Sequence, residues 1–388
     1  MPISGLRLQG IRNLVPQAIA PARGVNLLAG PNGAGKTSAL EAIWLLGRGR
    51  SFRARSIETV VGYGADHCTV FGVIDATDGH GGTMQRRLGV SRETSGGFHF
   101  RIDGASATTT SALADVLPLV LINSDSFALL EGPPQGRRRY LDWGVFHTVP
   151  ASRELWRQHQ RAHQQRNTLL REARVDTRQL ALWDERLAIA GEAVTNYRRD
   201  YVEQIRPIIE RVLSEITSGL GQLKLGFHPG WDAERPLAEA LRAHREKDIM
   251  HSGTQIGAHR ADLRVRMGGR AAAEALSRGQ IKMLVMAMLM AQGIHYRERC
   301  GSACVSLLDD LPAELDSEHR RRVARLVSSS GQAFVTGTDA DHLLAAWADS
   351  SVASELKLFH VEQGRLTDRS SPEPLPTESR CDNLTNPD

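Results

Sequence analysis

The segment from Gly30 to Thr37 restricts the fold of this chain more than any other part of the sequence. It reads Gly-Pro-Asn-Gly-Ala-Gly-Lys-Thr and matches the pattern G-x-x-x-x-G-K-[ST] of a phosphate-binding loop, or P-loop. An apolar run at 25–29 precedes it, and a helical apolar pattern at 38–46 follows it. Strand, loop and helix in this order are the setting that the motif requires. We therefore expect a nucleotide-binding α/β domain rather than a glycine-rich turn without a ligand.

The chemistry of a P-loop assigns roles to its residues. Backbone N–H groups and the positive end of the following helix dipole surround the phosphates. Lys36 is expected to reach the β- and γ-phosphates, and the Thr37 hydroxyl is expected to bind Mg²⁺. The predicted binding residues are Gly30, Pro31, Asn32, Gly33, Ala34, Gly35, Lys36 and Thr37.

A second apolar strand, predicted at 305–308, ends in two carboxylates, Asp309 and Asp310. On a P-loop fold this arrangement, called Walker B, completes the catalytic site. Asp309 is expected to join the Mg²⁺ shell beside Thr37, and Asp310 is expected to polarise the attacking water. Taken alone the pair could end a strand in a solvated acidic turn, and the P-loop in the same chain favours the catalytic role.

A third candidate site precedes the apolar helical run at 281–292. Ser277 suits the N-cap of this helix, Gly279 allows another group to approach its first turn, and Gln280 follows. A helix N-terminus of this kind binds anions. The alternative is a well-capped core helix. The segment lies about thirty residues before the acidic strand, which favours the phosphate site.

Length and composition limit the class of protein. A chain of 388 residues exceeds what one hydrophobic core usually serves, so more than one lobe is expected. It has 41% hydrophobic and 24% charged residues, no apolar run long enough for a membrane span and no secretion signal. The four scattered cysteines predict neither a disulfide framework nor a zinc site. We expect a cytoplasmic protein, and its net charge of +4 permits a polyanionic partner.

The pattern along the chain predicts an α/β P-loop head with mixed parallel and antiparallel sheets and an inserted helical arm. Short strand-like segments between 5 and 109 suggest an antiparallel sheet beside the parallel sheet of the P-loop. Helical spacing with few glycines marks the arm, in which Pro207 is expected to begin or kink a helix. The predicted parts are an ATPase lobe at 1–150, the arm at 151–245, the second part of the head at 246–367 and a disordered tail at 368–388.

The order of P-loop, helical insertion, Ser-x-Gly-Gln helix and Asp-Asp strand resembles the head of an ABC-type ATPase. The resemblance implies a homodimer that sandwiches two ATP molecules, with Ser277, Gly279 and Gln280 acting on the nucleotide of the other copy. Asp316, in the stretch 313–316, resembles the aspartate of the D-loop at the dimer seam.

Several blocks in order narrow the resemblance to the bacterial RecF family. They are 6–14, 47–53, 122–134, 137–144, 257–263 and 309–316. The resemblance implies a weak ATPase whose ATP-bound dimer clamps double-stranded DNA near gaps and single-strand/double-strand junctions, without reading sequence. It implies partners RecO and RecR, help in RecA loading, roles in recombinational repair and replication restart, and no membrane. An ABC transporter subunit and a non-hydrolysing DNA scaffold are the alternatives.

Two departures from the ABC pattern matter. Asp310 stands where many such ATPases carry Glu, and its shorter side chain predicts slow turnover. The usual switch histidine after the strand at 332–335 is missing: Thr336 and Thr338 stand there, and His342 lies farther along on a predicted helix.

Arginines provide the candidate DNA contacts. Arg153, Arg157 and Arg161 recur every four residues and should share one helix face, and Arg166 extends the basic bias. Such a stripe could bind the DNA backbone, or it could be an ordinary solvated face. Another basic run, 137–139, is expected in a loop, where it could contact DNA or nearby carboxylates. Finally, Arg12 and Asn13 could approach the nucleotide, whereas His259 is expected to be structural.

Overall fold

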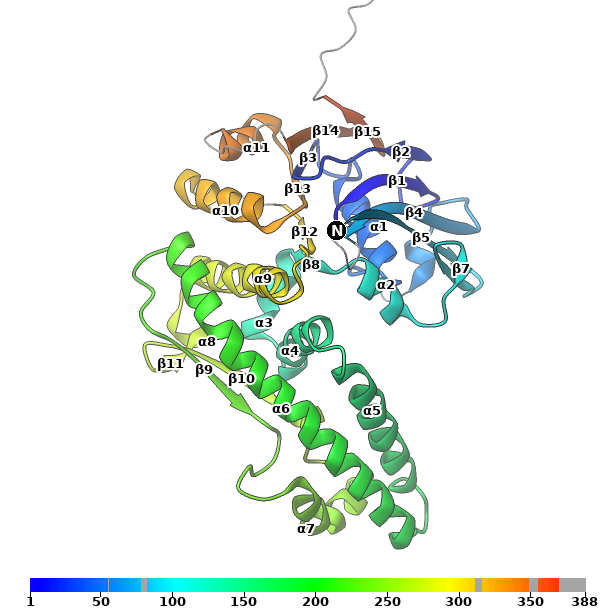
Figure 1. The fold of residues 1–388 in the computed structure, drawn as a ribbon, viewed down its shortest axis with the longest axis vertical. Helices are drawn as coiled ribbons and strands as arrows, with labels where there is room; N and C mark the ends of the chain where they lie inside the picture. Colours follow the sequence, from blue (N-terminus) through cyan, green and yellow to red (C-terminus); the bar gives the residue numbers. More distant parts are fainter. Residues whose placement is uncertain (55, 78–81, 311–315, 349–354, 370–388) are drawn as a thin grey trace, which may run out of the picture.

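The computed structural model describes residues 1–388 except 55, 78–81, 311–315, 349–354 and 370–388. It shows a head made of two sheets with their helices, and an elongated arm that projects from the head (Figure 1). The head contains both chain segments that flank the arm in sequence. The predicted fold class, an α/β head with an inserted helical arm, is confirmed.

The P-loop belongs to a six-stranded, mainly parallel sheet. Its inner strands are parallel neighbours, and only the edge pair β14–β15 is antiparallel. The carboxyl ends of β3, β13 and β12 therefore lie side by side, which is where ligands bind in open α/β sheets. In spatial order the strands are β15 (Arg365–Asp368), β14 (Leu356–Glu362), β3 (Val25–Ala29), β13 (Ala333–Gly337), β12 (Val305–Leu308) and β8 (Leu119–Ile122).

The second six-stranded sheet of the head is antiparallel, as the sequence predicts. The helix that follows the P-loop, α1 (Lys36–Arg48), contacts strands of both sheets. Gly72 of β4 lies so close to it that an added Cβ would stand 2.4 Å from Leu46. In spatial order the strands are β2 (Gln17–Ile19), β1 (Ile3–Gln9), β4 (His67–Thr77), β5 (Thr83–Glu93), β6 (Phe98–Ile102) and β7 (Ala105–Ser106).

Further helices cover the parallel sheet and connect it to the arm. They are α2 (Thr110–Val116), α3 (Ala128–Glu131), α4 (Pro134–Thr148), α8 (Ala272–Ala275), α9 (Arg278–Cys300), α10 (Ser317–Ser330) and α11 (Ala340–Trp347). Short 3-10 turns are η1 (Ile57–Thr59), η2 (Ser124–Phe127) and η3 (Ala258–Arg260). The apolar face of α9 lies in the largest core cluster, together with residues of α4 and of the arm.

The arm consists of α5 (Ser152–Leu169), α6 (Thr177–Ile216) and α7 (Leu237–Met250). Two expectations need correction. α6 runs unbroken for 40 residues with Pro207 in its interior, so Pro207 does not begin a helix. The predicted arm is also not all helical, because β9 (Leu223–His228) pairs with β10 (Asp262–Met267), which pairs with β11 (Arg270–Ala271). The sequence boundary at 245 falls inside α7.

Buried ion pairs hold the three arm helices together. Arg166 of α5 lies 2.6 Å from Asp184 of α6 and 2.8 Å from Asp248 of α7, measured between nitrogen and carboxylate oxygen. Arg245 of α7 also pairs with Asp184, at 2.7 Å. Arg166 has no exposed surface, so the expectation that it extends the basic bias of this segment is wrong for the surface of the arm. It lies on the opposite face of α5 from Arg153, Arg157 and Arg161, and its charge is neutralised inside the arm.

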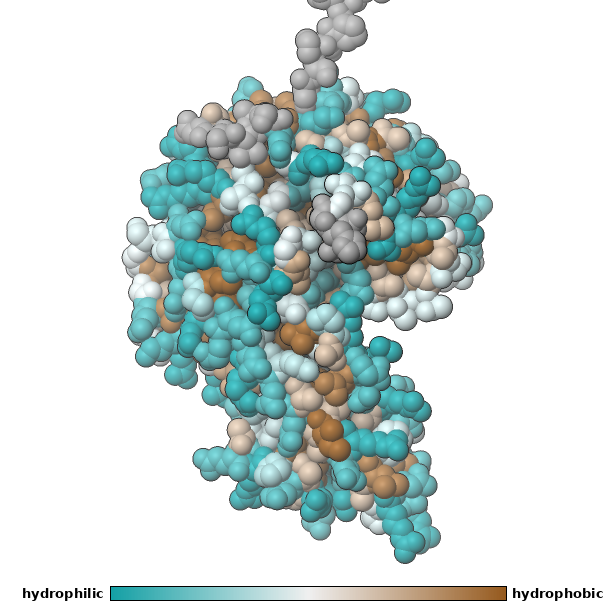
Figure 2. All heavy atoms as spheres, viewed as in Figure 1, coloured by the Kyte–Doolittle hydropathy of each residue, from teal (hydrophilic) through white to brown (hydrophobic). Residues whose placement is uncertain are grey.

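The surface seen in Figure 2 is mainly hydrophilic, with scattered apolar residues on the head and along the arm. Within the part of the chain that the structure describes, no helix combines the length and the apolar character needed to cross a membrane. Asp368 is the last residue of β15, so a tail could begin only after it. The rest of the predicted tail, from 370 onward, lies outside the described residues.

Candidate functional site

The P-loop connects β3 to α1 and has the backbone geometry of an anion-binding turn. At Gly30 a Cβ would stand 2.0 Å from the Val361 carbonyl oxygen, so only glycine fits. Gly35, the N-cap of α1, has a φ of 116° and leaves the first turn without a side-chain cap. That turn also has no acidic residue. Its N–H groups are therefore available to an anion.

Lys36 lies over the same loop. Its ammonium group donates hydrogen bonds to the carbonyl oxygens of Gly30, at 2.7 Å, and Pro31, at 2.9 Å. Burial lowers the pKa of Lys36, while the charges of Asp310 and Asp309 act in the opposite direction. The lysine is thus placed between the loop and the acidic pair, where the predicted phosphates would lie.

The structure brings Thr37 and Asp309 together across 272 positions of sequence: the Thr37 hydroxyl donates to Asp309 Oδ1 at 2.9 Å. Burial raises the pKa of Asp309, and hydrogen bonds from Thr37 and Thr336 oppose that rise. A hydroxyl and a carboxylate are the hard oxygen ligands that Mg²⁺ prefers, usually with waters and phosphate completing its shell. These two residues fit the metal predicted for the site.

Asp310 and Thr336 lie at the carboxyl ends of the neighbouring strands β12 and β13. The sequence left open which residue takes the place of the switch histidine in this region. Asp310 is exposed and has a φ of 55°, a left-handed conformation that aspartate tolerates better than most residues with a side chain. Its N–H donates to the Thr336 hydroxyl at 2.7 Å, and that hydroxyl donates to Asp309 Oδ1 at 3.0 Å. Thr338 is exposed, and His342 lies on α11 as predicted. Sequence reasoning noted Thr336 but missed these bonds.

Two residues that follow β1, Arg12 and Asn13, contact the P-loop and helix α1. Asn13 donates to the Gly33 carbonyl oxygen at 2.9 Å and accepts from the Ser38 hydroxyl at 3.0 Å. Arg12 forms an ion pair at 2.8 Å with Glu41, which is fully buried in α1. Arg12 and Asn13 therefore lie beside the P-loop and the start of α1, and their approach to the nucleotide stays a prediction. Ser38 and Glu41 were not singled out from the sequence, and their place in the helix pattern gives no signal of this role.

The candidate signature helix is α9, and its N-terminus is built as predicted. Ser277 is the N-cap: its hydroxyl accepts from the Gln280 N–H, and Gln280 Oε1 accepts from the Ser277 N–H at 2.9 Å. Gly279 is exposed and a Cβ there would meet nothing within 4 Å. The fold of this chain alone therefore does not require glycine at 279.

Most of the candidate DNA-binding arginines are engaged within the chain. Arg153 pairs with Asp115 at 2.6 Å, and Arg157 pairs with Glu154 at 3.0 Å. Arg157 and Arg161 are exposed on α5, whereas Arg153 is half-buried. The structure thus places all three arginines on α5. Arg153 and Arg157, the two nearest the head, have acidic partners.

The basic run at 137–139 lies in α4, so the expectation of a loop is wrong. Pro133 and Pro134 begin this helix rather than break it, because proline is tolerated in a first turn. Arg137 pairs with Asp262 of β10 at 2.7 Å, and Arg138 donates to the Ala261 carbonyl oxygen. Of the two roles left open, contact with carboxylates and backbone of the chain itself describes these two arginines.

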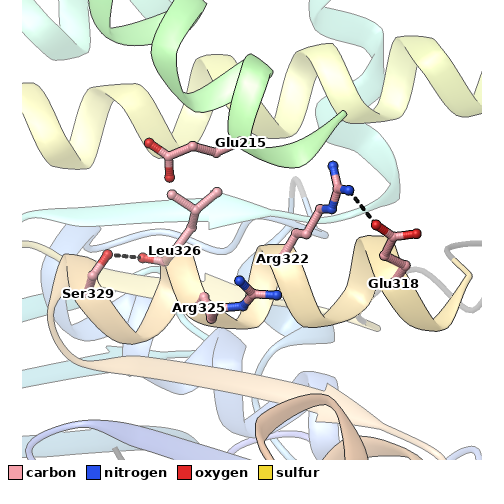
Figure 3. A pocket seen from close by; sticks show the side chains of 6 residues that line it. All are labelled: Glu215, Glu318, Arg322, Arg325, Leu326 and Ser329. Atoms are coloured by element: carbon pink, nitrogen blue, oxygen red, sulfur yellow. Dashed lines mark hydrogen bonds and ion pairs between the residues drawn. The ribbon is translucent and has the colours of Figure 1, made fainter. Parts of the chain in front are cut away.

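A cavity of about 540 Å³ lies between the end of α6 and α10 (Figure 3). Arg322, one of its charged residues, pairs with Glu318 on the same helix. None of its lining residues belongs to the P-loop, and neither Asp309 nor Asp310 lines it. The cavity is therefore separate from the candidate nucleotide site. Its lining residues are Glu215, Glu318, Arg322, Arg325, Leu326 and Ser329.

The predicted D-loop falls largely on 311–315, outside the described residues. Asp316 itself is described and is the N-cap of α10. Its side chain accepts from the N–H groups of Glu318 and His319, and these hydrogen bonds lower its pKa, those of His319 most. In this chain Asp316 therefore orders the start of the helix that follows the acidic strand.

Comparison with known proteins gives concordant results. A family model described as the RecF/RecN/SMC N terminal domain matches residues 2–364. The "DNA replication and repair protein RecF" of Pseudomonas putida (strain GB-1) is 44% identical over 368 residues, covering 95% of this chain and 98% of that protein. A solved structure of "the recombination mediator protein RecF-ATP in RecFOR pathway" has a TM-score of 0.82 at 23% identity, covering 95% of this chain and 97% of that one. An Smc head bound to the C-winged helix domain of ScpA has a TM-score of 0.59 at 16% identity, with coverage of 95% and 97%.

Proposed function

This chain belongs to the RecF family, and on that premise we propose that it is a slow ATPase whose ATP-bound dimer holds DNA during replication and repair. Its relatives are named as DNA replication and repair proteins, and a solved relative is described with ATP. The single observation that carries the proposal is the contact between Thr37 and Asp309 at 2.9 Å. It joins the two predicted halves of one site for ATP and Mg²⁺.

Each residue of the chain has a definite part in this proposal. Lys36 and the N–H groups of the loop and of the first turn of α1 bind and orient the phosphates. Thr37 and Asp309 hold Mg²⁺, which when bound neutralises charge on the phosphate oxygens. Asp310, exposed at the end of β12, orients the attacking water and accepts its proton. Its shorter side chain, in place of Glu, is our reason for expecting slow turnover.

Dimerisation is proposed from the start of α9. Ser277 and Gln280 cap the helix, and Gly279 leaves open space beside its first turn. A helix N-terminus without acidic residues attracts phosphate. We propose that Ser277, Gly279 and Gln280 contact the γ-phosphate of ATP bound to the other copy. Hydrolysis would then remove the bridge between the copies and release the DNA.

The DNA partner follows from the family and from the charge of the chain. The proposed ligand is double-stranded DNA near single-strand gaps, bound through its phosphates without sequence readout. Arg157 and Arg161 on α5 remain exposed candidates for this contact, and Arg153 is the weakest of the three because it is half-buried beside Asp115. RecO and RecR are proposed as partners because the solved relative is described in the RecFOR pathway.

The test is the size of the protein in solution, measured by light scattering with and without ATP. We expect a monomer without nucleotide, a dimer with ATP and a longer-lived dimer for Asp310→Asn, which should bind ATP but hydrolyse it slowly. A protein that stays monomeric in ATP at every concentration, with and without duplex DNA, would refute the clamp. Wild-type dimerisation and DNA binding by both Lys36→Met and Asp310→Asn would instead support a scaffold in which ATP has no active role.

A further inference from the structure

One residue at the carboxyl end of β13 lies between the two halves of the proposed ATP site. β13 is hydrogen-bonded to the P-loop strand β3 on one side and to the acidic strand β12 on the other. Thr336, its fourth residue, is 1% exposed. The next residue, Gly337, accepts a hydrogen bond from the Gly30 N–H at 3.3 Å. The end of β13 therefore contacts both the P-loop and the acidic pair.

The Thr336 hydroxyl makes two hydrogen bonds with opposite roles. It accepts from the Asp310 N–H at 2.7 Å and donates to Asp309 Oδ1 at 3.0 Å. A hydroxyl has one proton to donate, so this proton is committed to the carboxylate. The same oxygen atom thus fixes a peptide of one acidic residue and the side chain of the other.

Both bonds act on groups that would otherwise be free to move. Asp309 Oδ1 also accepts from Thr37 at 2.9 Å, so two hydroxyl groups define the orientation of its carboxylate. Asp310 has a left-handed φ of 55°, a conformation that few residues other than glycine, asparagine and aspartate adopt. Its N–H donates to the Thr336 hydroxyl. This hydrogen bond fixes the orientation of the Asp310 backbone at the end of β12.

We propose that Thr336 is a positioning residue for hydrolysis, which orients Asp309 toward Thr37 and fixes the backbone from which Asp310 reaches the attacking water. The inference rests on the ATPase function proposed above. It assigns a role to a residue of the strand after which ABC-type ATPases usually carry a switch histidine, which this chain lacks. Thr336 acts through the two carboxylates and does not itself contact the substrate.

The first test compares three variants in ATPase assays. Thr336→Val keeps the β-branched shape but removes the hydroxyl, so we expect kcat to fall at least tenfold. KM and the affinity for a non-hydrolysable ATP analogue should stay within about twofold, because the P-loop contacts are unchanged. Thr336→Ser restores the hydroxyl and should recover kcat to within about threefold. Thr367→Val, at an exposed threonine of β15 in the same sheet, is the matched control and should behave as wild type.

The second test does not depend on hydrolysis. In nucleotide-free protein, hydrogen exchange of a peptide spanning Asp310 should be faster in Thr336→Val than in wild type, because its N–H loses its acceptor. Thr336→Ser should exchange like wild type.

Two results would overturn the inference while leaving the ATPase function standing. One is a Thr336→Val protein with wild-type kcat. The other is a parallel loss of nucleotide affinity and kcat, which would indicate a general role in folding. A wild-type protein without ATPase activity would instead refute the proposed function, and the inference with it.

Discussion

The buried ion pairs of the arm and the acidic site of the head differ in what their charged residues contact. In the arm, Arg166 and Asp184 are buried and paired with each other across helices. In the head, Asp310 is exposed, and the Lys36 ammonium group bonds to carbonyl oxygens of its own loop. Charges that are satisfied inside the chain stabilise the fold, whereas charges left accessible around a glycine-rich turn are placed for a ligand. This difference separates structural from functional residues better than residue type does.

The largest effect should come from the exposed carboxylate of the head. Asp310→Asn removes the proposed proton acceptor, so we expect kcat for ATP to fall by ~10²–10⁴. Because this side chain is exposed, the free energy of unfolding in urea should change by less than ~0.5 kcal/mol. Steady-state ATPase assays and urea titrations measure the two quantities. An unchanged kcat would show that Asp310 is not the proton acceptor. It would also contradict the distinction between accessible, functional charges and buried, structural ones.

The reverse behaviour is expected for the buried charge of the arm. Arg166→Met leaves Asp184 and Asp248 without their shared partner, and breaking such a buried pair costs ~3–5 kcal/mol of stability. Activity per folded molecule should stay within about twofold. Urea unfolding provides the measurement, and Arg157→Met on the exposed side of the same helix is the matched control. If both variants unfold alike, the arm pairs are not structural.

Acid should act where the arm meets η3, through His159 of α5 and His259 of η3. Burial lowers the pKa of His159 and of His259 to about 3 each, with smaller contributions from nearby histidines and from Arg198 and Arg260. Both rings are therefore neutral when folded but become protonated in the unfolded chain below its pKa of ~6.5. Their contribution to stability is complete above that pH and is lost as pH falls, by ~1.4 kcal/mol per ring at pH ~5.5. Urea unfolding above pH ~6.5 and at pH ~5.5 measures this loss of stability. His159→Phe should reduce the loss.

The smallest effect is expected from the exposed arginines of α5. Neutralising Arg157 and Arg161 together should change the free energy of unfolding by less than ~0.5 kcal/mol, since surface ion pairs contribute little. If they contact DNA, the salt dependence of binding should weaken by about one unit of slope per lost phosphate contact. Fluorescence anisotropy at several salt concentrations measures that slope. An unchanged slope would remove the arm from the DNA site.

The sequence alone predicted the local parts of the site and one long-range pairing, that of Thr37 with Asp309, but missed the other long-range contacts. The P-loop, the Ser277 cap and the acidic strand are contiguous patterns whose geometry depends on a few neighbouring residues. The spacing of Arg166 already puts it on the other face of its helix from Arg153, Arg157 and Arg161, but only the packing of three helices reveals its acidic partners. The position of Thr336 in a strand does not reveal its role either. Asp309 and Asp310 become its partners only because β12 and β13 pair in the sheet.

Helix α6 spans 40 residues without interruption, a length of about 60 Å. At one end it packs with α5 and α7, and towards the other it lies against α9 (Figure 1). Because one continuous helix contacts both groups, a single element of secondary structure sets the direction in which the arm leaves α9.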